Sequence, residues 1–91
     1  MAKAAATLVS ADGSLAMDLF TNQPAMQLYS GNYLAGVPER SGGVYSAYAG
    51  VALETQFLPD SPNHPEWPQP DCWLKPGETY RHTTVLAFRN A

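Results

Sequence analysis

One carboxylate, Glu54, interrupts a run of strand-forming residues that extends from residue 50 to residue 58. A carboxylate inside a strand either faces solvent or acts as an acid or base that exchanges a proton with a bound molecule. Alternation places Glu54 on the same face as Ala52 and Gln56, which is the more polar face of the predicted strand. Pattern alone favours the solvent-facing interpretation, because charged residues are mostly exposed and seldom buried unpaired.

A second candidate, Gln27, lies in another predicted strand, residues 25–30, on the same face as Tyr29. A glutamine on a strand is usually solvated, so its position alone does not predict contact with a ligand. His64 and His82 lack the spacing of a zinc site with Cys72, and no metal site is expected. Both histidines are predicted to be structural hydrogen-bonding residues rather than acids.

The sequence lacks the motifs of two further chemistries, nucleophilic hydrolysis and phosphate binding. There is no Gly-x-Ser-x-Gly elbow to present a nucleophile. The run from Ser41 to Gly43 lacks the lysine and the strand-to-helix context of a phosphate-binding loop. The sequence therefore predicts no cofactor.

Composition limits the partners that the chain of 91 residues can have. Five Lys or Arg residues are scattered singly among eight Asp or Glu residues, so the patch that nucleic acid requires is absent. The apolar run near the start is short and rich in Ala and Thr, which indicates a strand rather than a signal peptide. No run reaches the ~20 apolar residues of a membrane-spanning helix. The lone Cys72 is predicted to be a small buried thiol, and it favours a reducing, cytoplasmic location.

The elements that must position Glu54 and Gln27 are strands. Asp12 and Gly13 lie between two strand-like runs, and a Gly after Asp supplies the positive φ of a hairpin turn. The predicted strands are residues 5–10, 14–21, 25–30, 50–58 and 79–88. No amphipathic helix is apparent, so the chain is predicted to be all-β.

Residues 59–76 hold six prolines in eighteen residues, which disfavours both a helix and an internal strand. Proline recurs at every third position from 59 to 68, so a polyproline ligand for an SH3-type module is one interpretation. Trp67 and Trp73 favour another, an ordered loop anchored by indole rings to the body of the protein.

Four segments in order resemble the carboxy-terminal quarter of the galactose mutarotase (aldose 1-epimerase) family. They are residues 23–36, 50–56, 59–65 and 74–80. In that family the Glu of the Leu-Glu-Thr-Gln motif is the catalytic base, and this motif falls on Glu54. The Gln of the Pro-x-x-Gln-x-Tyr-x-Gly-Asn motif contacts the sugar, and it falls on Gln27. The resemblance reverses the preference for a solvated Glu54.

The resemblance implies a portion of a large antiparallel β-sandwich, the galactose mutarotase-like supersandwich, with residues 1–91 as a single carboxy-terminal segment. It implies interconversion of the α and β anomers of hexoses such as galactose or glucose by general acid and base catalysis of ring opening. The family's acid is a histidine well upstream, and neither His64 nor His82 matches its motif. The chain alone is therefore expected to be inactive, because it supplies the base without the acid.

The expected partners are a hexose substrate and further polypeptide. Charged residues make up only 14% of the chain, which indicates surface meant to be covered. We expect the missing amino-terminal portion of the same enzyme, or self-association through strand edges, to cover it. The alternative function is a non-catalytic carbohydrate-binding or assembly module. Three tyrosines of residues 31–50 could stack on a sugar, although packing within that loop is favoured: Tyr33, Tyr45 and Tyr48.

Overall fold

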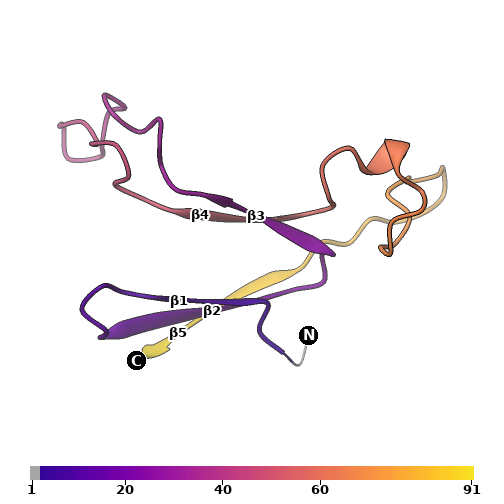
Figure 1. Cartoon of the computed structure of the whole chain (residues 1–91), viewed down its shortest axis with the longest axis horizontal. Helices are drawn as coiled ribbons and strands as arrows, with labels where there is room; N and C mark the ends of the chain where they lie inside the picture. The colour runs from indigo at the N-terminus through magenta and orange to yellow at the C-terminus, as the bar shows by residue number, and fades with distance from the viewer. Residues whose placement is uncertain (1–2) are drawn as a thin grey trace.

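The computed structural model describes residues 3–91, so the first two residues of the predicted 1–91 segment lie outside the described residues. Its strands are β1 (Ala6–Val9), β2 (Leu15–Thr21), β3 (Ala25–Tyr29), β4 (Ala52–Gln56) and β5 (Thr84–Asn90), and a 3₁₀ helix, η1 (Ser61–Asn63), precedes β5. Sheet A has the order β1-β2-β5, and sheet B pairs β3 with β4. All neighbouring strands are antiparallel. The predicted all-β class is confirmed, and Figure 1 shows the sheets as two layers that diverge from a common end.

The β1–β2 hairpin forms where Asp12 and Gly13 predict it. Gly13 has a φ of 74°, a left-handed conformation that costs glycine little. The Asp12 carboxylate accepts hydrogen bonds from the Ser10 hydroxyl and from the backbone and hydroxyl of Ser14. These bonds lower the pKa of Asp12 to about 2, and the bond from Ser10 has the largest effect. The side chain therefore closes the turn as an ionised group.

The last strand begins later and ends later than predicted. β5 covers Thr84–Asn90 rather than residues 79–88. Thr21, the last residue of β2, pairs with Thr84, so residues 79–83 extend past the end of their partner strand. There the Asn22 side chain donates to the Arg81 carbonyl and accepts from the Thr83 amide, and it replaces the missing ladder bonds.

Residues 31–50 form the loop that the sequence predicts between β3 and β4. The Tyr48 amide donates to the Gly31 carbonyl over 2.8 Å and closes the loop at its base. Gly31 has a φ of 76°, and a Cβ there would lie 2.5 Å from the Gly50 carbonyl oxygen. Glycine is therefore required at this position. Tyr33 and Tyr48 are 85% and 68% exposed, so these two tyrosines do not pack the loop as expected.

The two sheets do not close a core of their own. Ala16 and Leu19 are the buried apolar residues among those that the structure describes. A cleft of about 350 Å³ opens between sheet A and Val51, which precedes β4. Phe88 on the cleft side of sheet A remains 64% exposed. The radius of gyration is 16.7 Å, whereas a compact domain of this length would have about 12 Å.

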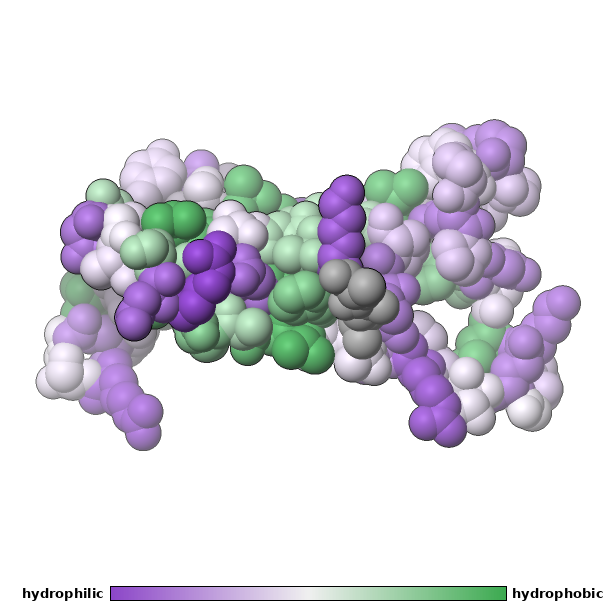
Figure 2. Space-filling view, turned by 90° about the horizontal axis from the view of Figure 1, so that it is seen from below, coloured by the Kyte–Doolittle hydropathy of each residue, from purple (hydrophilic) through white to green (hydrophobic). Residues whose placement is uncertain are grey.

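Apolar side chains consequently reach the surface. Figure 2 shows an apolar band along the middle of the molecule, flanked at both ends by hydrophilic loops. Exposed patches of this kind mark surfaces that meet other polypeptide. The architecture agrees with a portion of a larger β-sandwich.

Candidate functional site

Strand pairing brings the two predicted site residues together. In the antiparallel register of β3 and β4, Gln27 lies directly opposite Glu54. Opposite residues share one face of a sheet, with Cβ atoms about 4.5–5.5 Å apart. Residues 27 positions apart in the chain thus become neighbours, and both side chains are exposed.

The orientation of this face follows from Thr55, the residue after Glu54. The Thr55 hydroxyl is hydrogen-bonded to the Thr84 hydroxyl of β5 over 2.9 Å, so the Thr55 side chain faces sheet A. Successive side chains of a strand point to opposite faces. Glu54 and Gln27 therefore face away from sheet A, on the outer face of sheet B.

Gln56 is a third member of this face that sequence reasoning did not assign to the site. Its Nε2 atom donates to Oε1 of Gln27 over 3.5 Å. This contact directs the amide oxygen of Gln27 toward Gln56 and leaves the amide nitrogen to donate elsewhere. The signal was present in the alternation of Ala52, Glu54 and Gln56, which predicts that all three share a face.

The chemistry of this face is that of a proton acceptor beside amide donors. The Glu54 carboxylate can accept a proton from a hydroxyl group, and the Gln27 and Gln56 amides can donate and accept hydrogen bonds. Such a set suits a neutral, hydroxyl-rich ligand. A group of three or more His, Cys, Asp or Glu side chains that could hold a metal ion is not found within residues 3–91.

Neither histidine lies beside Glu54 on the outer face of sheet B. His82 contacts Thr55 on the opposite face of sheet B, at 2.7 Å from Nε2 to the hydroxyl. His64 lies in the proline-rich loop, where Glu66 accepts from Nδ1 and Asp60 from Nε2 at 2.9 and 3.0 Å. The predicted hydrogen-bonding roles of both histidines are confirmed.

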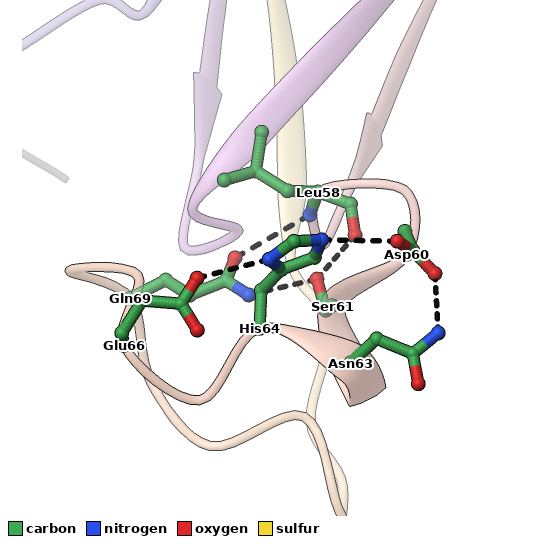
Figure 3. Close-up of polar contacts among 7 residues, drawn as sticks. All are labelled: Leu58, Asp60, Ser61, Asn63, His64, Glu66 and Gln69. Atoms are coloured by element: carbon green, nitrogen blue, oxygen red, sulfur yellow. Dashed lines mark hydrogen bonds and ion pairs between the residues drawn. The ribbon is translucent and has the colours of Figure 1, made fainter.

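The His64 cluster orders the proline-rich loop. Figure 3 shows the imidazole between the carboxylates of Asp60 and Glu66. The hydrogen bond to Glu66 raises the pKa of His64 above its usual value, and the bond to Asp60 adds to this against an opposing effect of burial. Trp67 stacks on the imidazole with ring centroids 4.0 Å apart.

The proline-rich loop departs from three interpretations of the sequence. Asp60 has a φ of 66°, and η1 follows it, so the chain does not run as a continuous polyproline helix. Trp67 stacks within the loop, and Trp73 is 63% exposed, so the expected anchoring of both indoles on the body of the protein is wrong. Cys72 is half-buried rather than buried, because the exposed loop gives its thiol little cover.

Comparison with known proteins gives the family. The family model described as aldose 1-epimerase matches residues 2–87. The chain belongs to the aldose 1-epimerase family. It is 55% identical over 86 residues to an aldose 1-epimerase of Escherichia coli (strain K12), a match that covers 94% of this chain. This family membership confirms the resemblance that the four sequence segments carry.

Other members of the aldose 1-epimerase family match the same region. An aldose 1-epimerase of Haemophilus influenzae is 48% identical over 90% of the chain, and a galactose mutarotase of Mus musculus is 44% identical over 79% of it. The matched regions make up 25%, 24% and 21% of these three relatives. The chain thus spans about a quarter of the length of the curated relatives that it matches. No solved structure matches the chain.

The part of the chain that the structure describes has no helix long and apolar enough to cross a membrane.

Proposed function

We propose that this chain forms the carboxy-terminal part of a cytoplasmic aldose 1-epimerase that interconverts the α and β anomers of hexoses such as galactose. In this proposal Glu54 is the catalytic base and Gln27 binds a sugar hydroxyl. The observation that carries it is the pairing of Gln27 opposite Glu54 on the exposed face of sheet B. Relatives named aldose 1-epimerase and galactose mutarotase support the same activity.

The reaction requires two proton transfers. Glu54 removes the proton from the C1 hydroxyl while an acid protonates the ring oxygen, and the bond between C1 and the ring oxygen breaks. The open-chain aldehyde then rotates about the C1–C2 bond, and the ring closes on the other face of the carbonyl. A carboxylate suits the first role because it accepts and returns a proton near neutral pH.

The acid comes from polypeptide outside residues 3–91. His82 lies on the opposite face of sheet B from Glu54, and His64 is held by two carboxylates in the loop. We propose that the amino-terminal portion of the enzyme supplies the acid and also covers the apolar cleft beside Val51. A half-site with the base alone gives no appreciable catalysis, since each proton-transferring group contributes about 10²- to 10⁴-fold.

The test uses a chimera in which residues 3–91 of this chain replace the quarter of the E. coli relative that the chain matches. Mutarotation of freshly dissolved α-D-galactose is followed by polarimetry. Glu54→Gln is expected to lower kcat at least about 10²-fold, because the amide keeps the size of the side chain but cannot take the C1 hydroxyl proton.

The matched control is Glu78→Gln, the same chemical change in the turn before residues 79–83, where Glu78 accepts from the Lys75 amide. It is expected to leave kcat and KM unchanged. A folded chimera without activity, or a Glu54→Gln variant within about threefold of the unmodified chimera, would contradict the proposal.

A further inference from the structure

A side-chain network joins the two sheets beneath Glu54. The Thr55 hydroxyl lies 2.7 Å from Nε2 of His82 and 2.9 Å from the hydroxyl of Thr84. Thr84 also lies 3.2 Å from Nε2 of His82 and 3.3 Å from the hydroxyl of Thr21 in β2. Among residues 3–91, Thr55 is the sheet B residue whose side chain hydrogen-bonds to a strand of sheet A.

The donor and the acceptor of successive hydrogen bonds in this network can be assigned, starting from Gln23. The amide oxygen of Gln23 can only accept, so the Tyr80 hydroxyl donates to it over 3.2 Å. The Tyr80 oxygen is then the acceptor for Nδ1–H of His82 over 3.4 Å. With its proton on Nδ1, His82 can accept at Nε2 from the Thr55 hydroxyl, and Thr55 can accept from Thr84.

Apart from this network, few contacts hold β4 over sheet A. Sheet B has two strands within residues 3–91, and a two-stranded sheet is marginally stable by itself. The sheets diverge away from their common end (Figure 1), so apolar packing between them is sparse. Within residues 3–91, the contacts of Thr55 are therefore the side-chain hydrogen bonds that hold β4 over sheet A.

We propose that His82 is a positioning residue for Glu54, which acts through Thr55 to fix β4 over sheet A. The proposal rests on the proposed function, in which Glu54 is the base. Thr55 and Glu54 are consecutive residues of one strand with side chains on opposite faces. A shift of Thr55 relative to β5 therefore moves the backbone that carries the Glu54 carboxylate, while the reacting atoms lie beyond the reach of His82.

Kinetics of the chimera test this role. His82→Ala is expected to lower kcat about 3- to 10-fold, the equivalent of one neutral hydrogen bond, with KM within about twofold. His82→Gln is expected to restore most of kcat, because its amide oxygen can accept from Thr55 where Nε2 does. Thr55→Val removes the hydroxyl and with it the contacts to both His82 and Thr84, so its loss is expected to be at least as large as that of His82→Ala. The double variant should lose less than the sum of the two single losses, since both single variants remove the contact between Thr55 and His82.

A second measurement and a control variant keep the outcomes distinct. Amide hydrogen exchange of residues 52–56 is expected to rise about tenfold in His82→Ala and to return in His82→Gln. Thr7→Val is the matched control, because the Thr7 hydroxyl bonds Asp18 within sheet A and does not contact β4. It should change neither kcat nor exchange in β4.

Unchanged kcat and unchanged exchange in β4 on His82→Ala, or additive losses in the double variant, would overturn the positioning role. Loss of the proposed function has a different signature. In that case Glu54→Gln retains activity, while exchange in β4 still reports whether His82 and Thr55 hold the strand.

Discussion

At the residue scale, Glu54 and Gln27 form a pair because two strands meet in one register. Neither residue is buried, and the Gln27 amide is turned by its contact with Gln56. A sugar bound across this pair would meet a proton acceptor and an amide donor on neighbouring strands. Sheet B can thus hold a proton acceptor and an amide donor close to each other, which is one requirement of a catalytic site.

The proposed role of Gln27 predicts a moderate effect on sugar affinity. Gln27→Ala in the chimera is expected to raise KM for α-D-galactose about 2- to 10-fold, because a neutral hydrogen bond contributes about 0.5–1.5 kcal/mol. The proton-transfer step should change little, since Glu54 remains in place. Initial rates from polarimetry at several sugar concentrations measure both constants. Unchanged values would show that Gln27 is a solvated strand residue.

His64 is the second residue whose surroundings give a measurable prediction. Its pKa is raised chiefly by the hydrogen bond to Glu66. Its contribution to stability is therefore fully present below the pKa of an unfolded histidine and is lost as pH rises through the higher folded pKa. The proline-rich loop is expected to loosen on the alkaline side of this transition.

NMR titration of the imidazole resonances checks this prediction. The pKa of His64 should lie above 6.5, the ordinary value. Glu66→Gln should lower it more than Asp60→Asn does, because the Glu66 contact is the larger cause. The resonance of His82 is the internal control, since His82 contacts neither carboxylate. A His64 pKa that both substitutions leave unchanged would contradict the cluster.

At the element scale, the long loop between β3 and β4 is closed at its base by backbone contacts. The Tyr48 amide donates to the Gly31 carbonyl, and Gly31 lies against the Gly50 carbonyl oxygen. This closure sets where β4 begins relative to the end of β3. It thereby maintains the register that pairs Gln27 with Glu54.

Gly31→Ala is expected to destabilise the chimera by at least about 2 kcal/mol. The left-handed φ costs a Cβ-bearing residue about 1–2 kcal/mol, and the added Cβ would also meet the Gly50 carbonyl oxygen. Urea unfolding measures the change. Gly50→Ala is the control, because its Cβ would meet the Leu34 side chain at an ordinary 3.6 Å. Equal stability of the two variants would contradict this account of the loop.

At the scale of the whole molecule, the chain is an open pair of sheets. Its radius of gyration of 16.7 Å and the 64% exposure of Phe88 and of Leu28 show that the faces between the sheets are uncovered. Unpaired strand edges and apolar faces are templates for other polypeptide. The proposed amino-terminal portion would cover both.

The isolated chain is therefore expected to self-associate or to require another segment to fold. Size exclusion coupled to light scattering measures the molar mass over a range of concentrations. The chimera is the control, because its remaining three quarters would cover the same faces. A monomer of about 10 kDa that unfolds in one sharp transition would show that these residues close a core alone. It would favour an independent binding module.

Much of the secondary structure is determined by local sequence. Asp12 and Gly13 specify a hairpin because their side chain and φ favour the turn wherever the flanking strands pair. Alternation along β4 specifies that Glu54 and Gln56 share a face, since the side-chain period of a strand is two. The aldose 1-epimerase family is likewise determined by sequence, through motifs that carry Glu54 and Gln27.

Only the tertiary structure decided the features that depend on a distant partner. β5 begins at Thr84 because β2 ends opposite it, and no local pattern in residues 79–88 encodes the length of β2. The stacking of Trp67 on His64 required the reversal at Asp60. The pairing of Gln27 with Glu54 and the link from Thr55 to His82 each join residues 27 positions apart. Composition and periodicity report which face a residue occupies, whereas the neighbour across that face is set by how strands pair and sheets stack.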